Sequence, residues 1–176
     1  MIKLFYYLIE QLYFRIPNNL AIYDQLTKVY NANWMLKIGY KKYANKECFV
    51  TMIDLNNFKQ INDLAGHAMG NGILIATGRQ LEALKYIDDK MDICRYGGDE
   101  FIIFSSLDIS SYLIADKTDL ISFGVTYKTK DIPIEAAIKL ADGKMYKYKK
   151  KNKITIKSEQ DIIKILRNTT IKRKKL

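Results

Sequence analysis

The sequence predicts a single α+β domain of the ferredoxin-like kind. Short apolar strands alternate with helical patterns, and two strands near the middle of the chain flank a glycine-rich turn and so form a hairpin. The 176 residues are 48% hydrophobic, which is enough for one good core and little more. The elements divide the chain into an N-terminal helical segment (residues 1–20), one α+β domain (21–157) and a C-terminal helix with a basic tail (158–176).

The first half of the chain holds three helical patterns and one strand. Apolar residues at helical spacing predict an amphipathic first helix, which Pro17 ends. Asn31 or Asn33 is expected to cap the second helix. A run of apolar residues around Val50 is long enough for a buried strand, and a helical pattern with Ile73, Leu74 and Leu81 on its apolar side follows it. The predicted elements are helix 1–16, helix 34–43, strand 47–55 and helix 70–86.

The second half begins with the hairpin, whose turn contains Gly97 and Gly98. Between the hairpin and the next strand there is room only for a crossover of one or two helical turns. Pro133 is expected to open the following helix, and Ser158 to start the last one. The predicted elements are strands 92–96 and 100–105, crossover 108–118, strand 120–127, helix 133–149, a short strand 154–157 and a helix from residue 158.

Charge and cysteine content limit the class of protein. Residues 144–176 hold 13 of the 29 Lys and Arg and 2 of the 19 Asp and Glu, a net charge of +11, while the other residues together carry −1. The basic end, residues 172–175, is either solvated or in contact with nucleic acid or an anionic membrane. Cys48 and Cys94 fall in predicted strands and are expected to be reduced, as in a cytoplasmic protein. No apolar run reaches the roughly 18 residues of a membrane span.

The hairpin turn carries the most informative chemistry. Asp99 and Glu100 stand side by side at the rim of the predicted sheet, and adjacent carboxylates there require a cation to neutralise them. Gly97 and Gly98 let the chain turn and leave room for a bulky ligand. Asp54 ends the buried strand, a good place for a metal ligand. A divalent metal that holds a nucleoside triphosphate is the expected occupant.

Further motifs occur in an order that resembles the GGDEF family, the diguanylate cyclases that condense two GTP into cyclic di-GMP. The resemblance extends from Asp24 to about Ile156 and implies a palm fold with a central antiparallel sheet. It is carried by Asp24-Gln25-Leu26-Thr27 with Asn31, Asp54 to Asp63, Gly66-His67 with Gly70-Asn71-Gly72, Arg95 to Phe101, and Ala141 to Tyr146.

The resemblance implies the roles of individual residues. Two Mg²⁺ or Mn²⁺ ions per active site are expected on Asp54, Asp99, Glu100 and the carbonyl of Leu55, with the acids as catalytic residues. The expected triphosphate ligands are Lys59, Lys149, Lys153 and backbone amides of Phe58 and its neighbours, with Gly97 and Gly98 also against the substrate. Lys153 stands where the family commonly has arginine.

Base recognition is where this sequence departs from the family. Guanine is expected to be read by Asn62 and by residue 71, where the family has an aspartate and this chain has Asn71. An amide faces the donors of guanine less well than a carboxylate, and it complements adenine. Asn56 replaces a second acid, and Ala32 an arginine. The family's product-inhibition site is lost, because Asp88 and Met91 stand at its arginine and aspartate.

These residues are compatible with three hypotheses about function. The leading hypothesis is an active homodimeric cyclase that uses GTP, ATP or both, with helix 1–16 as the dimerising element. Cyclic di-GMP is the default product, and an adenine-containing product is the sharper alternative. The second hypothesis is a degenerate domain that binds nucleotide or cyclic dinucleotide without catalysis. The third is a nucleic-acid-associated palm that uses the basic tail.

Overall fold

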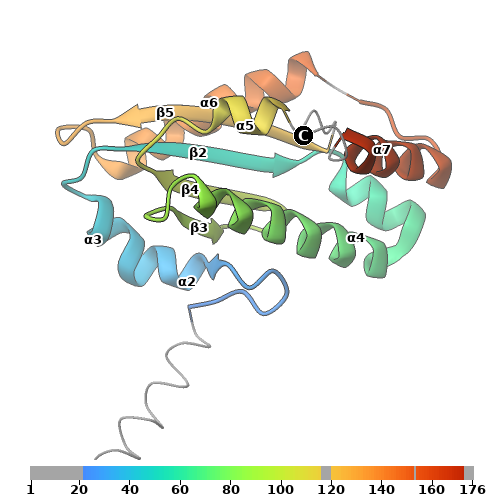
Figure 1. Ribbon diagram of the computed structural model, residues 1–176, viewed down its shortest axis with the longest axis horizontal. Coiled ribbons are helices and arrows are strands. Elements are labelled where there is room, and N and C mark those ends of the chain that lie inside the picture. The colour runs from blue at the N-terminus through green and yellow to red at the C-terminus, as the bar shows by residue number, and fades with distance from the viewer. Residues whose placement is uncertain (1–21, 116–119, 153, 173–176) are drawn as a thin grey trace, which may run out of the picture.

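A five-stranded sheet organises the chain, as seen in a computed structural model that describes residues 22–115, 120–152 and 154–172 (Figure 1). The strand order is β1-β3-β4-β2-β5. β2 pairs antiparallel with β4 and β5, β3 pairs antiparallel with β4, and β1 runs parallel to β3 at the edge. The strands are β1 Tyr30–Asn31, β2 Cys48–Leu55, β3 Asp92–Arg95, β4 Glu100–Ser105 and β5 Ile121–Lys128.

Helices cover both faces of this sheet. Helix α4, the short α5 and the C-terminal α7 share one hydrophobic core with one face, and α6 and the helix from α2 to α3 share a second core with the other. In the chain, β2, α4, β3, β4, α5 and β5 follow one another, so the predicted ferredoxin-like α+β fold is confirmed. The helices are α2 Ala32–Trp34, η1 Met35–Gly39, α3 Tyr40–Tyr43, α4 Phe58–Ala83, η2 Leu84–Tyr86, α5 Ser110–Ala115, α6 Ile134–Lys151 and α7 Glu159–Lys172.

β2 is apolar along nearly its whole length because it is covered on both sides. Successive side chains point to opposite faces, so Ile53 and Leu55 belong to the core beneath α4 while Val50 and Met52 belong to the core beneath α6. Cys48 and Cys94 are buried and free, as predicted. Burial raises the pKa of the Cys94 thiol to about 12, which keeps it protonated and unreactive.

Two elements differ from the sequence prediction. The helix expected from residue 70 begins at Phe58. Its first turns were missed because Gly66 (φ 79°, ψ 160°) kinks the helix and interrupts the apolar periodicity from which it was predicted. The strand expected over residues 154–157 is wrong. The carbonyls of Ile154 and Ile156 accept hydrogen bonds from side chains of Asn57 and Gln60, so a side-chain contact with α4 takes the place of a strand ladder. The N-terminal helix 1–16, Lys153 and the end of the basic tail lie outside the described residues.

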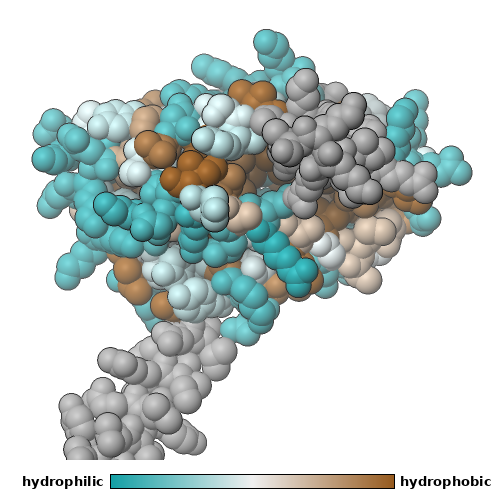
Figure 2. Space-filling model, viewed as in Figure 1, coloured by the Kyte–Doolittle hydropathy of each residue, from teal (hydrophilic) through white to brown (hydrophobic). Residues whose placement is uncertain are grey.

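The face of the molecule seen in Figure 1 is mostly hydrophilic, with hydrophobic residues exposed in separate patches (Figure 2). Among the described residues, no helix has the length and apolar content that a membrane crossing requires. The predicted cap of the second helix is confirmed at Asn31, whose side chain accepts a hydrogen bond from the backbone N–H of Trp34 at 3.1 Å.

Gly124 of β5 permits the close approach of α6. A Cβ at this residue would lie 2.2 Å from the carbonyl oxygen of Ala141 and 2.3 Å from the backbone nitrogen of Met145. We expect Gly124→Ala to lower the free energy of unfolding by about 1–3 kcal/mol or more, because backbone atoms cannot give way as a side chain can. Gly143→Ala is the matched control, since a Cβ there meets nothing within 4 Å. In a helix this change should be neutral or stabilising by up to about 1 kcal/mol. Urea unfolding curves for both variants test the packing, and two equal curves would contradict it.

Candidate active site

The three acids expected to bind metal lie at the same end of the sheet. Asp54, near the end of β2, lies directly opposite Glu100, the first residue of β4. Asp99 precedes Glu100 in the hairpin turn, and its carbonyl oxygen accepts a hydrogen bond from the N–H of Leu55 at 3.1 Å. Cross-strand partners share a face of the sheet, so Asp54 and Glu100 present their carboxylates on the same side. The β2–β4 register and the hairpin turn therefore bring these three acids to the same end of the sheet.

The turn between β3 and β4 is shaped around Glu100. The N–H groups of Tyr96 and Gly97 donate to the carbonyl oxygen of Glu100 at 2.9 and 3.3 Å. A Cβ on Gly97 would lie 2.5 Å from Glu100 Oε2. Glycine at residue 97 therefore leaves space for the Glu100 carboxylate, whereas the sequence suggested that it leaves space for a ligand. Gly98 is exposed, and a Cβ there would meet nothing within 4 Å.

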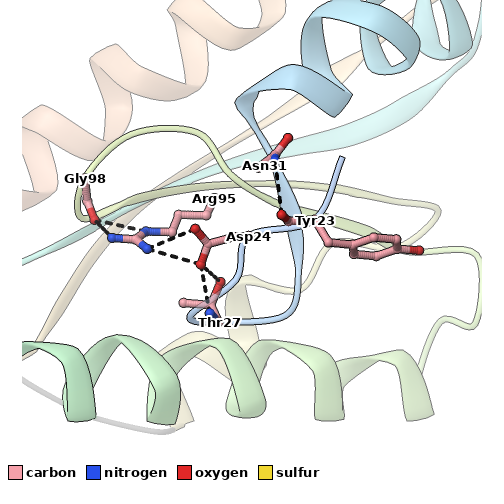
Figure 3. A network of polar contacts seen from close by, with 6 residues as sticks. All are labelled: Tyr23, Asp24, Thr27, Asn31, Arg95 and Gly98. Atoms are coloured by element: carbon pink, nitrogen blue, oxygen red, sulfur yellow. Dashed lines mark hydrogen bonds and ion pairs between the residues drawn. The ribbon is translucent and has the colours of Figure 1, made fainter. Parts of the chain in front are cut away.

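Arg95 holds this turn to the loop before β1 (Figure 3). Its Nε and Nη2 donate to the carbonyl oxygen of Gly98 at 3.1 and 2.6 Å, and its Nη1 donates to both carboxylate oxygens of Asp24 at 3.1 Å. Asp24 Oδ1 also accepts hydrogen bonds from the N–H and the hydroxyl of Thr27, at 2.8 and 2.7 Å. Asn31 Nδ2 donates to the carbonyl of Tyr23 at 3.1 Å and closes the loop.

The electrostatics of Asp24 favour this contact. Partial burial opposes its charge, but the hydrogen bonds from Thr27 and Arg95 outweigh burial and hold the pKa of Asp24 below its ordinary value. Sequence reasoning used the segment containing Asp24 and Thr27 only as part of a resemblance, and gave Arg95 no role. The opposite charges of Arg95 and Asp24 are the feature from which the contact could have been predicted, but the two residues are 71 positions apart in the sequence.

The acidic cluster carries more negative charge than its surroundings neutralise. Burial, and next the charge of Asp54, raises the pKa of Asp99. Burial, and next the charges of Asp99 and Asp54, raises the pKa of Glu100. The ammonium of Lys149, from the last turns of α6, forms an ion pair with Asp54 Oδ1. Among the described residues, no three His, Cys, Asp or Glu side chains are grouped as a ready-made metal site.

The N-terminus of α4 lies just beyond the end of β2. Asn57 has left-handed backbone geometry (φ 57°), and its carbonyl accepts the hydrogen bond from Ile61 N at 2.9 Å. The amides of Phe58, Lys59 and Gln60 therefore precede the first hydrogen bond of the helix, a position that favours anions. The Lys59 side chain is exposed. The structure thus brings Lys149 to Asp54 and Lys59 to the start of α4.

The kink at Gly66 brings together the residues expected to read the base. A Cβ on Gly70 would lie 2.0 Å from Asn62 Oδ1, so the Asn62 amide packs directly on the Gly70 backbone. Asn71, the next residue, is exposed. The two expected base contacts therefore lie near each other across the kink, although they are nine positions apart in the sequence.

Asp88 and Met91, which stand at the family's product-inhibition positions, are both buried. Asp88 is buried, and its carboxylate accepts hydrogen bonds from the backbone N–H groups of Lys90 and Ser106 at 3.1 and 2.5 Å. Met91 is 2% exposed and belongs to the core beneath α4. An aspartate at residue 88 therefore ties the start of β3 to the end of β4.

We expect Glu100→Gln to stabilise the metal-free protein at pH 7. Burial, and next the charges of Asp99 and Asp54, raise the pKa of Glu100 above its ordinary value. Ionisation of this carboxyl therefore opposes folding above the folded pKa, and the penalty disappears as the pH falls through that pKa to the ordinary, unfolded value. Melting temperatures with a chelator at pH 7 and at pH 4 should show a gain that shrinks at the lower pH. Glu135→Gln is the control, because Glu135 is exposed in the first turn of α6. Its loss removes a favourable helix charge and should not stabilise. A Glu100→Gln protein less stable than the wild type at pH 7 would refute the repulsion.

Comparisons with known proteins agree with this geometry. A family model described as "Diguanylate cyclase, GGDEF domain" matches residues 21–112, more than half of the chain. Diguanylate cyclase DgcP of Escherichia coli is 36% identical over 100 residues, which cover 54% of this chain and 26% of DgcP. Diguanylate cyclase VdcA of Vibrio cholerae is 28% identical over 152 residues, which cover 73% of this chain and 44% of VdcA. The chain thus spans less than half the length of these curated relatives.

Solved structures share the fold. The coiled coil and GGDEF domain of DgcB from Caulobacter crescentus, in complex with c-di-GMP, has a TM-score of 0.69 at 18% identity, covering 84% of this chain and 92% of that one. Diguanylate cyclase SiaD from Pseudomonas aeruginosa, in complex with its activator SiaC, has a TM-score of 0.67 at 20% identity, covering 85% of this chain and 66% of that one. With the fold, the hairpin acids and the family match in agreement, this chain belongs to the GGDEF-domain family of diguanylate cyclases.

Proposed function

We propose that the chain is a nucleotidyl cyclase that condenses two purine nucleoside triphosphates into a cyclic dinucleotide. In each of two steps a ribose 3′-oxygen attacks an α-phosphorus, the bond to the β-phosphate oxygen breaks, and pyrophosphate leaves while the hydroxyl proton passes to solvent. The observation that supports this best is the location of Asp54, Asp99 and Glu100 at the same end of the sheet as Lys149 and the amides that open α4.

The donor set suits Mg²⁺ or Mn²⁺. Asp54, Asp99, Glu100 and the Leu55 carbonyl supply hard oxygens, and the raised pKa values of Asp99 and Glu100 reflect buried negative charge that a divalent cation would neutralise. These residues would hold two ions, which when bound make the 3′-hydroxyl more acidic and the α-phosphate more electrophilic. Arg95 contributes indirectly, by holding the Gly98 carbonyl and so the conformation of the turn.

The phosphate side of the site consists of this chain's cations and amides. The amides of Phe58, Lys59 and Gln60 at the start of α4, with the Lys59 ammonium, would receive the β- and γ-phosphates. Lys149 pairs with Asp54 in the structure. With a metal at Asp54 its ammonium would be available to the triphosphate, as would Lys153.

Catalysis by this route requires two copies of the chain. Each domain would bind one triphosphate, and closing a cyclic dinucleotide requires two such sites to face each other. We therefore propose a homodimer, with the segment 1–16 as its contact, an element that lies outside the described residues.

A second candidate is a domain that binds nucleotide without turnover. The observation that favours it is Asn56, which replaces an acid beside the site and accepts a hydrogen bond from the Ser122 hydroxyl at 2.7 Å. Binding of labelled GTP without any product from wild-type protein would select this candidate.

We expect Asp99→Ala to lower the rate of product formation by at least about a hundredfold, because a lost ligand removes charge stabilisation from the transition state. Purified protein is incubated with Mg²⁺ or Mn²⁺ and labelled GTP, ATP or both, and the products are resolved by mass. Asp131→Ala, an exposed change in the loop after β5, should keep wild-type activity. Undiminished turnover in Asp99→Ala would exclude this residue from the reaction.

The base preference is expected to depend on Asn71. If its amide stands in for a carboxylate that reads guanine, ATP should be accepted beside GTP, and Asn71→Asp should restore preference for GTP. An amide facing the wrong donors leaves a group unpaired at about 1–3 kcal/mol, which is about one to two decades of selectivity. Competition between equimolar ATP and GTP measures it. A wild type that makes only cyclic di-GMP, with Asn71→Asp no more selective, would mean that the base is read elsewhere.

A further inference from the structure

The chain returns to the active-site end of α4 after leaving α6. Residues 154–166, here named the C-terminal strap, comprise an extended stretch and the first part of α7. Asn57 Nδ2 donates a hydrogen bond to the carbonyl of Ile154 at 3.0 Å, and Gln60 Nε2 donates to the carbonyl of Ile156 at 2.5 Å. Asn57 is the residue that caps α4 and Gln60 belongs to its first turn, where the proposed phosphate-binding amides lie.

The C-terminal strap is anchored in the main core. Ile156 and Ile162 are each 1% exposed and share the core with Ile61 of α4. Asp161 accepts hydrogen bonds from the N–H groups of Lys157 and Ser158 at 2.8 and 3.0 Å, which fixes the start of α7. In Figure 1, α7 lies beside the N-terminal part of α4, and the two helices are in contact. The strap is therefore a packed part of the domain.

This contact joins the two parts of the site that are proposed to bind phosphate. The amides of Phe58 to Gln60 belong to α4 on one face of the sheet, whereas Lys149 belongs to α6 on the other. Only five positions separate Lys149 from Ile154 along the chain. The two side-chain hydrogen bonds thus tie the segment that follows Lys149 to the first turn of α4.

Residue types fit this role. Asn57 adopts a left-handed conformation that asparagine tolerates better than most residues, while its amide reaches Ile154. Gln60 is exposed, yet its side-chain amide donates a hydrogen bond to the carbonyl of Ile156.

We propose that Asn57 and Gln60 are positioning residues whose amides hold the C-terminal strap against α4, and that this contact sets the spacing between the α4 amides and Lys149 for a triphosphate. The role rests on the proposed nucleotide site. Neither side chain needs to touch the substrate.

The test compares Gln60→Met, which keeps the side-chain length but cannot donate, with Gln80→Met in the same helix as the control. Asn57→Gly, which keeps the backbone conformation accessible, tests the second contact. Full-length proteins are titrated calorimetrically with α,β-methylene GTP and Mg²⁺, and with GMP. We expect Gln60→Met and Asn57→Gly to bind the triphosphate analogue about five- to tenfold more weakly, as expected for about one lost hydrogen bond. GMP binding should be unchanged, which general loosening of the fold would not produce.

Hydrogen exchange without nucleotide separates this proposal from the proposed function. In Gln60→Met, the hydrogen-bonded amides of Ile61, Lys157, Ser158 and Asp161 should exchange faster together, while those of β2 and β4 keep the wild-type rates. Unchanged exchange would overturn the proposed contact, whether or not the wild type binds triphosphate. Absence of triphosphate binding by the wild type would instead reject the nucleotide site. Faster exchange with unchanged triphosphate affinity would overturn the positioning role and leave the strap a purely structural element.

Discussion

The partial burial of three carboxylates at one end of the sheet is the constraint to which the rest of this site responds. Asp54 and Glu100 are brought face to face by the β2–β4 register, and Asp99 adds a third charge from the turn. Repulsion and desolvation oppose ionisation of Asp99 and Glu100. Lys149 offsets part of the charge at Asp54. An arrangement that destabilises its own resting charges is typical of sites that bind cations, because the bound cation recovers the lost stability.

A rigid support is needed to hold such charges together. Arg95 supplies it on one side of the turn by joining the Gly98 carbonyl to the Asp24 carboxylate in a forked geometry that lysine could not reproduce. Gly97 leaves the space into which the Glu100 carboxylate fits. The hairpin tip is thus tied to the loop before β1 through the Arg95 guanidinium.

In the proposed function, the two faces of the sheet contribute different parts of the site. The helix on one face offers amides, and the helix on the other offers lysines, so their relative position has to be maintained across the sheet edge. Gly124 lets α6 approach the sheet through close backbone contact, and the C-terminal strap joins the end of α6 to the start of α4. If the proposed function holds, stability and substrate geometry depend on the same contacts.

Sequence alone determined the elements whose cause is local. β2 follows from a long apolar run, the hairpin from two glycines between apolar strands, and the second helix from the cap at Asn31. The places of Asp54 at a strand end and of Asp99 and Glu100 at a turn could be predicted because a strand end and a turn are local features. The start of α4 was missed because the positive φ of Gly66 breaks the periodicity that signals a helix. The Arg95–Asp24 ion pair, the Asn62–Gly70 contact and the side-chain bonds to residues 154 and 156 were decided only by the tertiary structure. Each depends on groups that have no distinguishing local pattern and meet only when the chain packs.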